Sequence, residues 1–174
     1  MTKQEVITQY NLLPHPEGGY YREVYRSPED VSLSRGERSA MTLIYYLLGS
    51  SDFSSWHRIL SDEAWIHIQG DLDLRIHMIN QQGDYNCLTL GKCADDAEPI
   101  MTVPARHWFA ADAVRSSSKT KIENAYALVS CVVAPGFHWE DFVMGDRAAL
   151  IDAFPKHKEI ITTLTRETSA KGGA

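Results

Sequence analysis

Cysteine is scarce in this sequence and basic residues are outnumbered by acidic ones, and each shortage excludes a class of protein. The three cysteines, Cys87, Cys93 and Cys131, are odd in number and form no C-x-x-C pair, which speaks against a disulfide framework or a zinc ribbon. The 17 Lys and Arg residues are scattered and face 23 Asp and Glu, for a net charge of −6. Binding to nucleic acid or to an anionic membrane surface needs a concentrated basic patch, so we expect neither partner.

Long apolar runs are also missing. The longest, from Ala125 to Phe137, is interrupted by Ser130 and is too short for a membrane span, which takes about 20 apolar residues. The first residues have no apolar stretch behind their charge, so no secretory signal is predicted. With 44% hydrophobic and 23% charged residues over 174 positions, the composition is that of an ordinary globular protein. We therefore expect a single cytoplasmic domain over 1–174.

Helix signals stand at the two ends of the chain. Residues 2–13 are predicted to form a helix, because Thr2 and Glu5 have capping-box spacing and apolar residues repeat on one face. Asp146 can cap a helix that begins after it, and Pro155 suits the first turn of a second one, which predicts a helical pair over 146–166. Residues 169–174 are predicted to be a flexible tail.

The pattern between the helices is that of strands. Region 17–143 contains short β-rich runs separated by turn signals, which favours a β-sandwich or barrel over βαβ units. Apolar residues alternate with polar ones over 72–78, so one face of this strand should pack and His77 should lie on a solvated surface. Trp56 and Trp139 are expected in the core.

The stretch 56–70 carries the first mark of a known family. It resembles the first cupin motif, HxHx(3)Ex(6)G, because His57, Glu63 and Gly70 stand at the family's spacing. Ile59 takes the place of the second histidine.

Two further segments extend this resemblance over nearly the whole chain. Residues 103–109 resemble the second cupin motif, PxGxxH, with Arg106 where the family has glycine and Phe109 where it has the last histidine. The sequence His-Pro-Glu-Gly-Gly at 15–19 is typical of one cupin subfamily whose activity is not established. The resemblance implies an all-β jelly-roll barrel, or double-stranded β-helix, with flanking helices, and it implies a homodimer.

The strand that contains Glu63 is the first candidate for function. Alternate residues of a strand share a face, so Glu63 shares one with Trp65 and His67. If Glu63 points inward as in cupins, this face lines a cavity, with His57 and Ile59 facing it from the neighbouring strand. A carboxylate and an imidazole held together can transfer protons near neutral pH. His57 and Glu63 are therefore the predicted catalytic pair.

A small-molecule ligand is the expected partner of this cavity. The residues predicted to contact it are Glu17, Gly18, Gly19, Trp65, His67 and Phe109. Two interpretations of the glycine-rich segment stay open: a turn that brings a strand onto the barrel, or a pocket mouth at which a ligand approaches the backbone. His67 also has a second interpretation, a buried histidine hydrogen-bonded to a carbonyl.

No cofactor is expected. The metal centres that the resemblance implies use three histidines and one glutamate, and only His57 and Glu63 stand in register here. Catalytic metal sites use about three protein ligands, so two are too few. His67 or His107 would complete a set if either side chain reached the centre. A divalent metal, if bound, would be held by His57, Glu63 and His67.

Three functions follow as hypotheses. The first is a metal-independent epimerase or isomerase that acts on a sugar or sugar nucleotide through His57 and Glu63, with the sugar implied by fold resemblance alone. The second is a cupin that binds a small ligand without catalysis. The third is a metal-dependent cupin oxidoreductase, which the replaced histidines disfavour.

Overall fold

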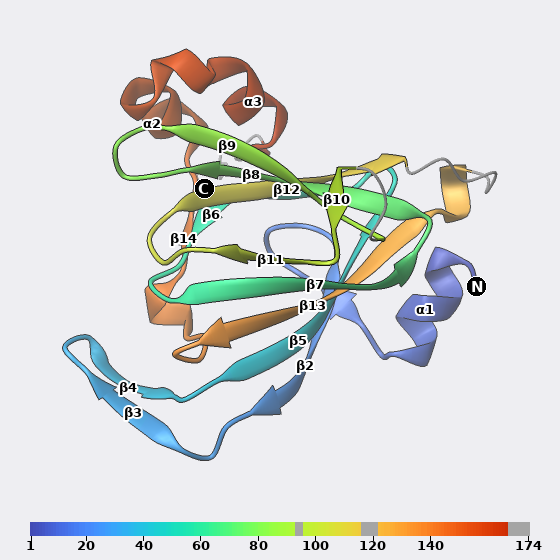
Figure 1. Cartoon of the computed structure of the whole chain (residues 1–174), viewed down its shortest axis with the longest axis horizontal. Coiled ribbons are helices and arrows are strands. Elements are labelled where there is room, and N and C mark those ends of the chain that lie inside the picture. Colours follow the sequence, from blue (N-terminus) through green and yellow to red (C-terminus); the bar gives the residue numbers. More distant parts are fainter. Residues whose placement is uncertain (93–95, 116–121, 167–174) are drawn as a thin grey trace, which may run out of the picture.

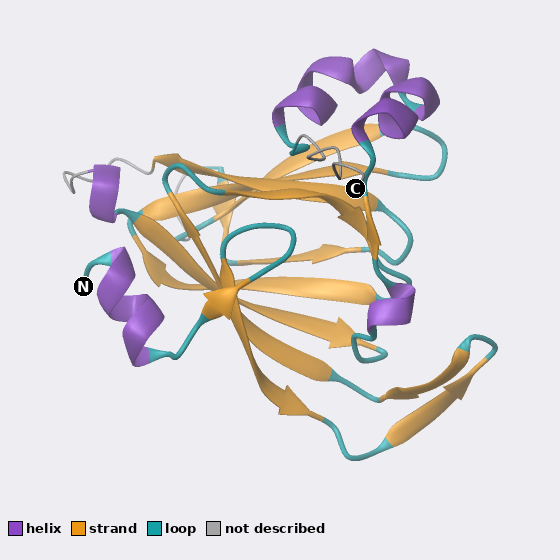
Figure 2. Ribbon diagram, turned by 180° about the vertical axis from the view of Figure 1, so that it is seen from behind, coloured by secondary structure: helices purple, strands orange, loops and turns teal. Residues whose placement is uncertain are grey.

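The structure is a computed structural model, and it describes residues 1–92, 96–115 and 122–166. Within these residues, the strands form two six-stranded sheets that face each other as a flattened barrel (Figure 1 and Figure 2). The helices lie outside the barrel, at its edges. The predicted all-β class with flanking helices is confirmed.

The first sheet has the strand order β1 (Leu13–Pro14), β2 (Tyr20–Arg26), β5 (Thr42–Gly49), β13 (Tyr126–Ala134), β7 (Asp62–Gly70) and β11 (Ile100–Val103). The second has the order β10 (Ala97–Glu98), β9 (Tyr85–Leu90), β8 (Leu72–Ile79), β12 (Trp108–Arg115), β6 (Phe53–Arg58) and β14 (Val143–Met144). Strands β3 (Asp30–Leu33) and β4 (Gly36–Ser39) form a hairpin that projects from the barrel (Figure 1). Consecutive strands of the chain often lie in different sheets, so residues close in sequence can face each other across the barrel.

The helical elements are α1 (Lys3–Gln9), α2 (Arg147–Ala153), α3 (Lys158–Thr163) and the 3-10 turns η1 (Ile122–Asn124), η2 (Trp139–Asp141) and η3 (Pro155–His157). The predicted capping box of α1 is present: the Glu5 amide donates a hydrogen bond to the Thr2 hydroxyl, and the Thr2 amide donates one to the Glu5 carboxylate. The helix ends earlier than predicted, because the chain from Leu13 pairs with β2. Asp146 caps α2 as predicted. The predicted tail at 169–174 lies outside the described residues.

Apolar side chains form three packed clusters. The largest fills the barrel interior, and it includes Trp65 and Phe109. A second lies beneath α2 and α3, where Trp56 packs against Leu150 and confirms its expected core position. A third lies beneath α1 around Val6. Complete burial of one such side chain stabilises the fold by about 1.5–3 kcal/mol. The helices thus pack against the outer faces of the two sheets, and none of these three helices fills the space between the sheets.

His77 does not lie on a solvated surface, and that prediction is wrong. Its Nδ1 atom is 2.7 Å from the Tyr85 hydroxyl and its Nε2 atom 2.9 Å from Asp112 Oδ1. Side chains from β9 and β12 therefore cover it, and it is 2% exposed. Burial by itself would raise the pKa of Asp112, but hydrogen bonds from His77 and Arg75 outweigh it and lower that pKa. The outer face of β8 carries an ordered polar network.

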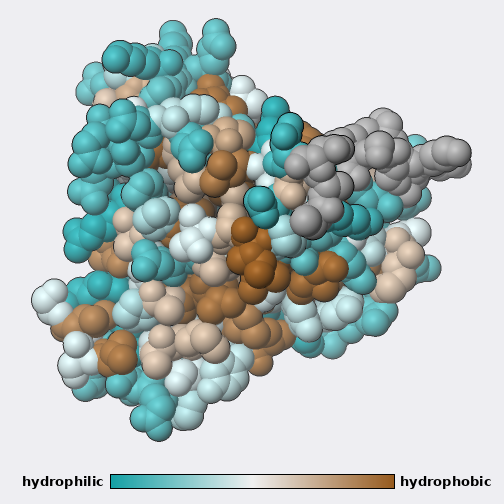
Figure 3. Space-filling view, in the orientation of Figure 1, coloured by the Kyte–Doolittle hydropathy of each residue, from teal (hydrophilic) through white to brown (hydrophobic). Residues whose placement is uncertain are grey.

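Apolar side chains also reach the surface. Figure 3 shows them gathered in the middle of one face, where Figure 1 places β11, β7 and β13. Ile68 of β7 and Ile100 of β11 are among the exposed apolar residues of these strands. Patches of this kind often mark interaction surfaces. The expected homodimer stays a prediction. None of the described helices is long and apolar enough to cross a membrane.

Candidate functional site

A cavity of about 130 Å³ lies between the two sheets. Residues from β2, β5, β6, β7 and β13 and from the segments flanking them line it: His15, Glu17, Tyr21, Glu23, Arg26, Thr42, Ile44, His57, Ile59, Glu63, Val133, Phe137, Trp139 and Phe142. The lining combines aromatic walls with a small set of titratable groups, which is the usual composition of a small-molecule site.

The loop between β1 and β2 carries Glu17 into the barrel. It passes between the two sheets (Figure 1 and Figure 2). The Ser55 amide on β6 donates to the Glu17 carbonyl at 2.8 Å. The Arg166 guanidinium donates to the same carbonyl and to the Phe53 carbonyl. A loop that starts in the first sheet is thereby tied to the second, and the Glu17 side chain is buried.

The two glycines of this loop pack against backbone. Gly18 has φ +116°, and a Cβ there would lie 2.2 Å from the Phe53 carbonyl oxygen. Gly19 has φ +67°, and its Cβ would lie 2.5 Å from the Leu47 carbonyl oxygen. Neither glycine lines the cavity. Of the two interpretations left open by the sequence, the structure supports the turn for Gly18 and Gly19, whereas Glu17 faces the cavity.

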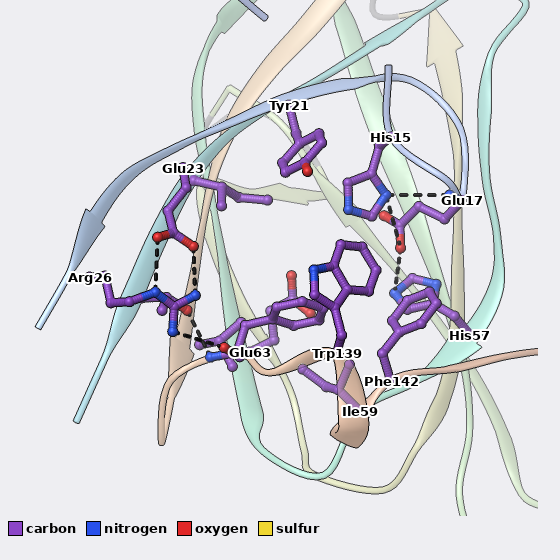
Figure 4. A pocket seen from close by; sticks show the side chains of 14 residues that line it. His15, Glu17, Tyr21, Glu23, Arg26, His57, Ile59, Glu63, Trp139 and Phe142 are labelled. Atoms are coloured by element: carbon purple, nitrogen blue, oxygen red, sulfur yellow. Dashed lines mark hydrogen bonds and ion pairs between the residues drawn. The ribbon is translucent and has the colours of Figure 1, made fainter. Parts of the chain in front are cut away.

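Glu17 and His57 share one proton. The Glu17 Oε2 atom lies 3.0 Å from His57 Nε2 (Figure 4). His57 Nδ1 lies 2.7 Å from the Ser55 carbonyl oxygen, which can only accept, so Nδ1 carries a proton. A single proton then lies between Nε2 and Oε2. Burial raises the pKa of Glu17 and lowers the pKa of His57 to about 4, so the proton between them is held by Glu17 and not by His57.

His15 supports this protonation state from the other side of Glu17. The Glu17 amide donates to His15 Nδ1 at 3.3 Å, so that nitrogen carries a lone pair. The same nitrogen lies 3.7 Å from Glu17 Oε2. Burial lowers the pKa of His15 despite the opposing effect of Glu17. Two imidazole lone pairs therefore face one carboxyl oxygen, which is stable only when the carboxyl group is protonated.

Glu63 supplies a second carboxyl group. It stands opposite Val133 of β13 and Val103 of β11, and it is 7% exposed. Burial raises its pKa to about 8, so Glu63 is protonated at neutral pH. The expectation that His57 and Glu63 lie on neighbouring strands is corrected. Strands β6 and β7 belong to different sheets, because the chain crosses the barrel between them.

The raised pKa of Glu63 predicts a loss of stability with rising pH. The folded state binds the Glu63 proton up to about pH 8, whereas an unfolded glutamate releases it near pH 4.5. Stability from this group is therefore lost as pH rises through that range, and His57 opposes the change only below its ordinary pKa of 6.5. From pH 6.5 to 8 the free energy of unfolding should fall by about 2 kcal/mol more in wild type than in Glu63→Gln. Urea unfolding at both pH values measures this difference; equal falls would contradict it, and Glu159→Gln on α3 is the control.

The other predicted residues lie outside the lining. Trp65 is buried in the barrel core beside Tyr46. Phe109 lies behind His57, with ring centroids 4.0 Å apart, and fixes the imidazole from beneath. His67 is half-buried farther along β7. Of the predicted site residues, the structure brings together Glu17, His57 and Glu63.

The metal centre of the family does not fit this donor set. Ile59 is 4% exposed and presents a hydrocarbon to the cavity. The Phe109 ring packs against His57 at an interplanar angle of 58°, and His67 is not part of the cavity wall. Within residues 1–92, 96–115 and 122–166, no group of three or more His, Cys, Asp or Glu side chains is placed to hold a metal ion.

Sequence reasoning missed much of the aromatic wall. Trp139 was expected in the core, yet it lines the cavity and is 51% exposed, which corrects that expectation. It lies after β13 in the turn η2, and no local pattern marks it as a cavity residue. His15 and Tyr21 also line the cavity. The sequence had singled out the segment 15–19, but it did not predict that His15 or Tyr21 would line the cavity.

A family model described as "Cupin superfamily (DUF985)" matches residues 4–145 of the chain. The chain belongs to this family. The predicted resemblance and the jelly-roll barrel are thereby confirmed. Among curated proteins, an uncharacterised protein of Saccharomyces cerevisiae is 27% identical over 157 residues, which cover 82% of this chain and 76% of the yeast protein.

Solved structures agree with this cupin over nearly its full length. A hypothetical protein from Leishmania major is 33% identical, with a TM-score of 0.87, and the match covers 96% of this chain and 100% of that one. A protein from Shewanella oneidensis is 31% identical, with a TM-score of 0.83, over 97% and 99% of the two chains. Oxalate decarboxylase from Bacillus subtilis has a TM-score of 0.54 at 18% identity, covers 87% of this chain and 36% of its own, and shows the fold alone.

Proposed function

We propose that the cavity binds a small hydroxylated carbonyl compound, such as a sugar derivative, and moves a proton on it, as an isomerase or epimerase does. The observation that carries this proposal is the buried contact of 3.0 Å between Glu17 Oε2 and His57 Nε2. When this neutral pair takes a proton from a ligand, the positive charge forms on His57, where it stays hydrogen-bonded to Glu17 and to the Ser55 carbonyl, so a buried site can carry out acid–base catalysis.

Glu17 and His57 have different roles in this proposal. Both ring nitrogens of His57 are engaged, one by Ser55 and one by Glu17, so His57 reaches a ligand only through Glu17. A shift of the shared proton to His57 Nε2 leaves Glu17 as a carboxylate base. Glu17, predicted from the sequence as a ligand contact, thus becomes the proposed base, and His57 stores the proton.

The proton balance closes with Glu63. Glu17 removes the proton from the carbon next to the carbonyl group while the Glu63 carboxyl gives its proton to the carbonyl oxygen, which forms an enediol. Glu17 then gives its proton to the neighbouring carbon, the enediol hydroxyl on the original carbon gives its proton to Glu63, and the proton on His57 returns to Glu17, which completes isomerisation. For epimerisation the enediol must turn so that Glu17 returns the proton to the opposite face of the original carbon, while the former carbonyl oxygen gives its proton back to Glu63. The step needs no oxidant, and Glu63 is protonated for it below about pH 8.

Deuterium exchange tests the proposal. The protein is incubated in D₂O with aldoses, ketoses and nucleotide sugars, and mass spectrometry and proton NMR follow the carbon next to the carbonyl group. We expect solvent deuterium to enter at that carbon in at least one compound, and the urea-unfolded protein to give none. Absence of exchange in every compound would count against catalysis.

A non-catalytic binding protein is the second candidate. The engagement of both His57 nitrogens and the protonated state of both carboxyl groups favour it, because the resting cavity holds no free base. Ligand binding without exchange would establish this alternative.

A further inference from the structure

Trp139 presents an aromatic face at the cavity that the fold does not cover. Its side chain lines the cavity and yet is 51% exposed. Three neighbouring rings hold it: Phe137 at 4.9 Å, Phe142 at 5.5 Å and His15 at 6.1 Å between centroids. In Figure 4 the indole lies between the Glu23–Arg26 pair on one side and the Glu17–His57 pair on the other. It is positioned to stack on a ring that enters the cavity.

An ion-pair cluster fixes the turn that carries this indole. Asp141, two residues farther on, is buried and accepts from Arg38 Nε at 2.8 Å and Nη2 at 2.9 Å. Arg35 donates to the same carboxylate at 3.1 Å. Both arginines come from the β3–β4 hairpin and the turn within it. Bidentate pairs of this kind fix geometry, so the stacking surface is preorganised and little ordering is left for binding.

The described lining of the cavity offers no free positive charge. Arg26 is the one Arg or Lys residue in this lining, and all three nitrogens of its guanidinium donate hydrogen bonds. Nε and Nη2 donate to the Glu23 carboxylate at 3.0 and 2.8 Å, and Nη1 donates to the Phe137 carbonyl at 3.1 Å. The imidazoles of His15 and His57 are neutral, as shown above. An anion that left water for this cavity would lose its hydration without gaining a counter-ion, which is costly.

The size and polarity of the cavity complete the description of its ligand. A volume of 130 Å³ is close to the roughly 150 Å³ of a protein cavity that holds one benzene molecule, so the cavity has room for one six-membered ring. Hydroxyl groups of Tyr21 and Thr42 and the carboxyl groups of Glu17 and Glu63 lie around it. These groups both donate and accept, as the hydroxyls of a polyol do.

We infer that the ligand of this cavity is a neutral, unphosphorylated hydroxylated ring of monosaccharide size, whose apolar face stacks on Trp139. This inference rests on the proposed function for the site and narrows it. Sugar phosphates, sugar acids and nucleotide sugars are excluded from productive binding because their charge finds no partner. The nucleotide sugars named among the sequence-based hypotheses are therefore not the expected ligands.

Saturation-transfer difference NMR and shift titration test the inference with two sets of probes. The neutral set is D-glucose, D-galactose, D-fructose, D-xylose and myo-inositol; the charged set is glucose 6-phosphate, glucuronate and UDP-glucose. We expect at least one neutral probe to bind, and the charged probes to bind at least tenfold more weakly. Trp139→Ala should weaken neutral binding about tenfold or more, whereas Trp139→Phe should retain most of it. Because Trp139 is half exposed, both variants should fold.

A second variant tests the charge argument by gain of binding. Glu23→Gln leaves Arg26 without its carboxylate partner, so affinity for glucose 6-phosphate should rise about tenfold or more above that of wild type. Wild-type protein that binds a charged probe in a Trp139-dependent way would overturn the inference, and so would binding to neither set. If that charged probe exchanged deuterium, the proposed function would survive. A neutral probe that binds and never exchanges would leave the inference standing and remove the proposed catalysis.

Discussion

Replacement of Glu17 by glutamine should abolish most proton transfer while the protein stays folded. The amide keeps the shape of the protonated carboxyl group and can donate to His57 Nε2 in its place, over the contact that measures 3.0 Å in wild type. It cannot accept a proton from carbon. Loss of a positioned acid–base group typically reduces rate by about 10²–10⁴-fold, and we expect deuterium exchange to fall within that range.

The stability of this variant separates chemistry from structure. A carboxyl group held neutral in the folded state but ionised in the unfolded chain lowers the free energy of unfolding near neutral pH, and an amide removes that cost, so urea unfolding should find Glu17→Gln at least as stable as wild type. Glu159→Gln, on the exposed side of α3, is the matched control for both exchange and stability. Full exchange activity in Glu17→Gln would remove Glu17 from the mechanism and return the base to another group.

Gly18→Ala should have the largest effect on stability. A Cβ at this position would lie 2.2 Å from the Phe53 carbonyl oxygen, and φ is +116°. Backbone atoms of β6 cannot move aside without loss of the Ser55–Glu17 hydrogen bond. We expect a loss of about 4 kcal/mol or more in the free energy of unfolding, or failure to accumulate as folded protein.

Gly83→Ala is the control that isolates backbone strain from collision. Gly83 also has a positive φ, +86°, but the atom closest to an added Cβ is a Phe154 ring carbon at 3.6 Å, an ordinary contact. Its expected cost is about 1–2 kcal/mol from the left-handed conformation alone. Urea unfolding of both variants gives the comparison, and equal costs would show that the loop around Gly18 can relax.

The sequence was informative wherever local patterns decide the outcome. Capping spacing placed the first helix and the Asp146 cap, because these depend on side chains three residues apart. Motif spacing located His57 and Glu63, which line one cavity. The glycines of segment 15–19 marked it in the sequence. The structure requires glycine at 18 and 19 because a Cβ at either position would collide with the backbone of a neighbouring strand.

Other features depend on which strands meet. His77 reads as a surface residue from alternation, and only the approach of β9 and β12 shows that Tyr85 and Asp112 cover it. Trp139 reads as core, and only the barrel shows that it stands at the cavity. Alternation reports the two faces of a strand, but it does not say what packs on each.

By itself, therefore, the sequence determined the all-β class, the N-terminal caps of α1 and α2 and the positions of two buried ionisable groups. The tertiary structure alone decided that Glu17 meets His57, since a loop of the first sheet must cross to a strand of the second for their side chains to touch. It also decided the proton that they share, because protonation depends on burial and on the Ser55 carbonyl that fixes the imidazole tautomer. Contacts between distant segments, and the desolvation they cause, are properties of the folded chain that no local pattern encodes.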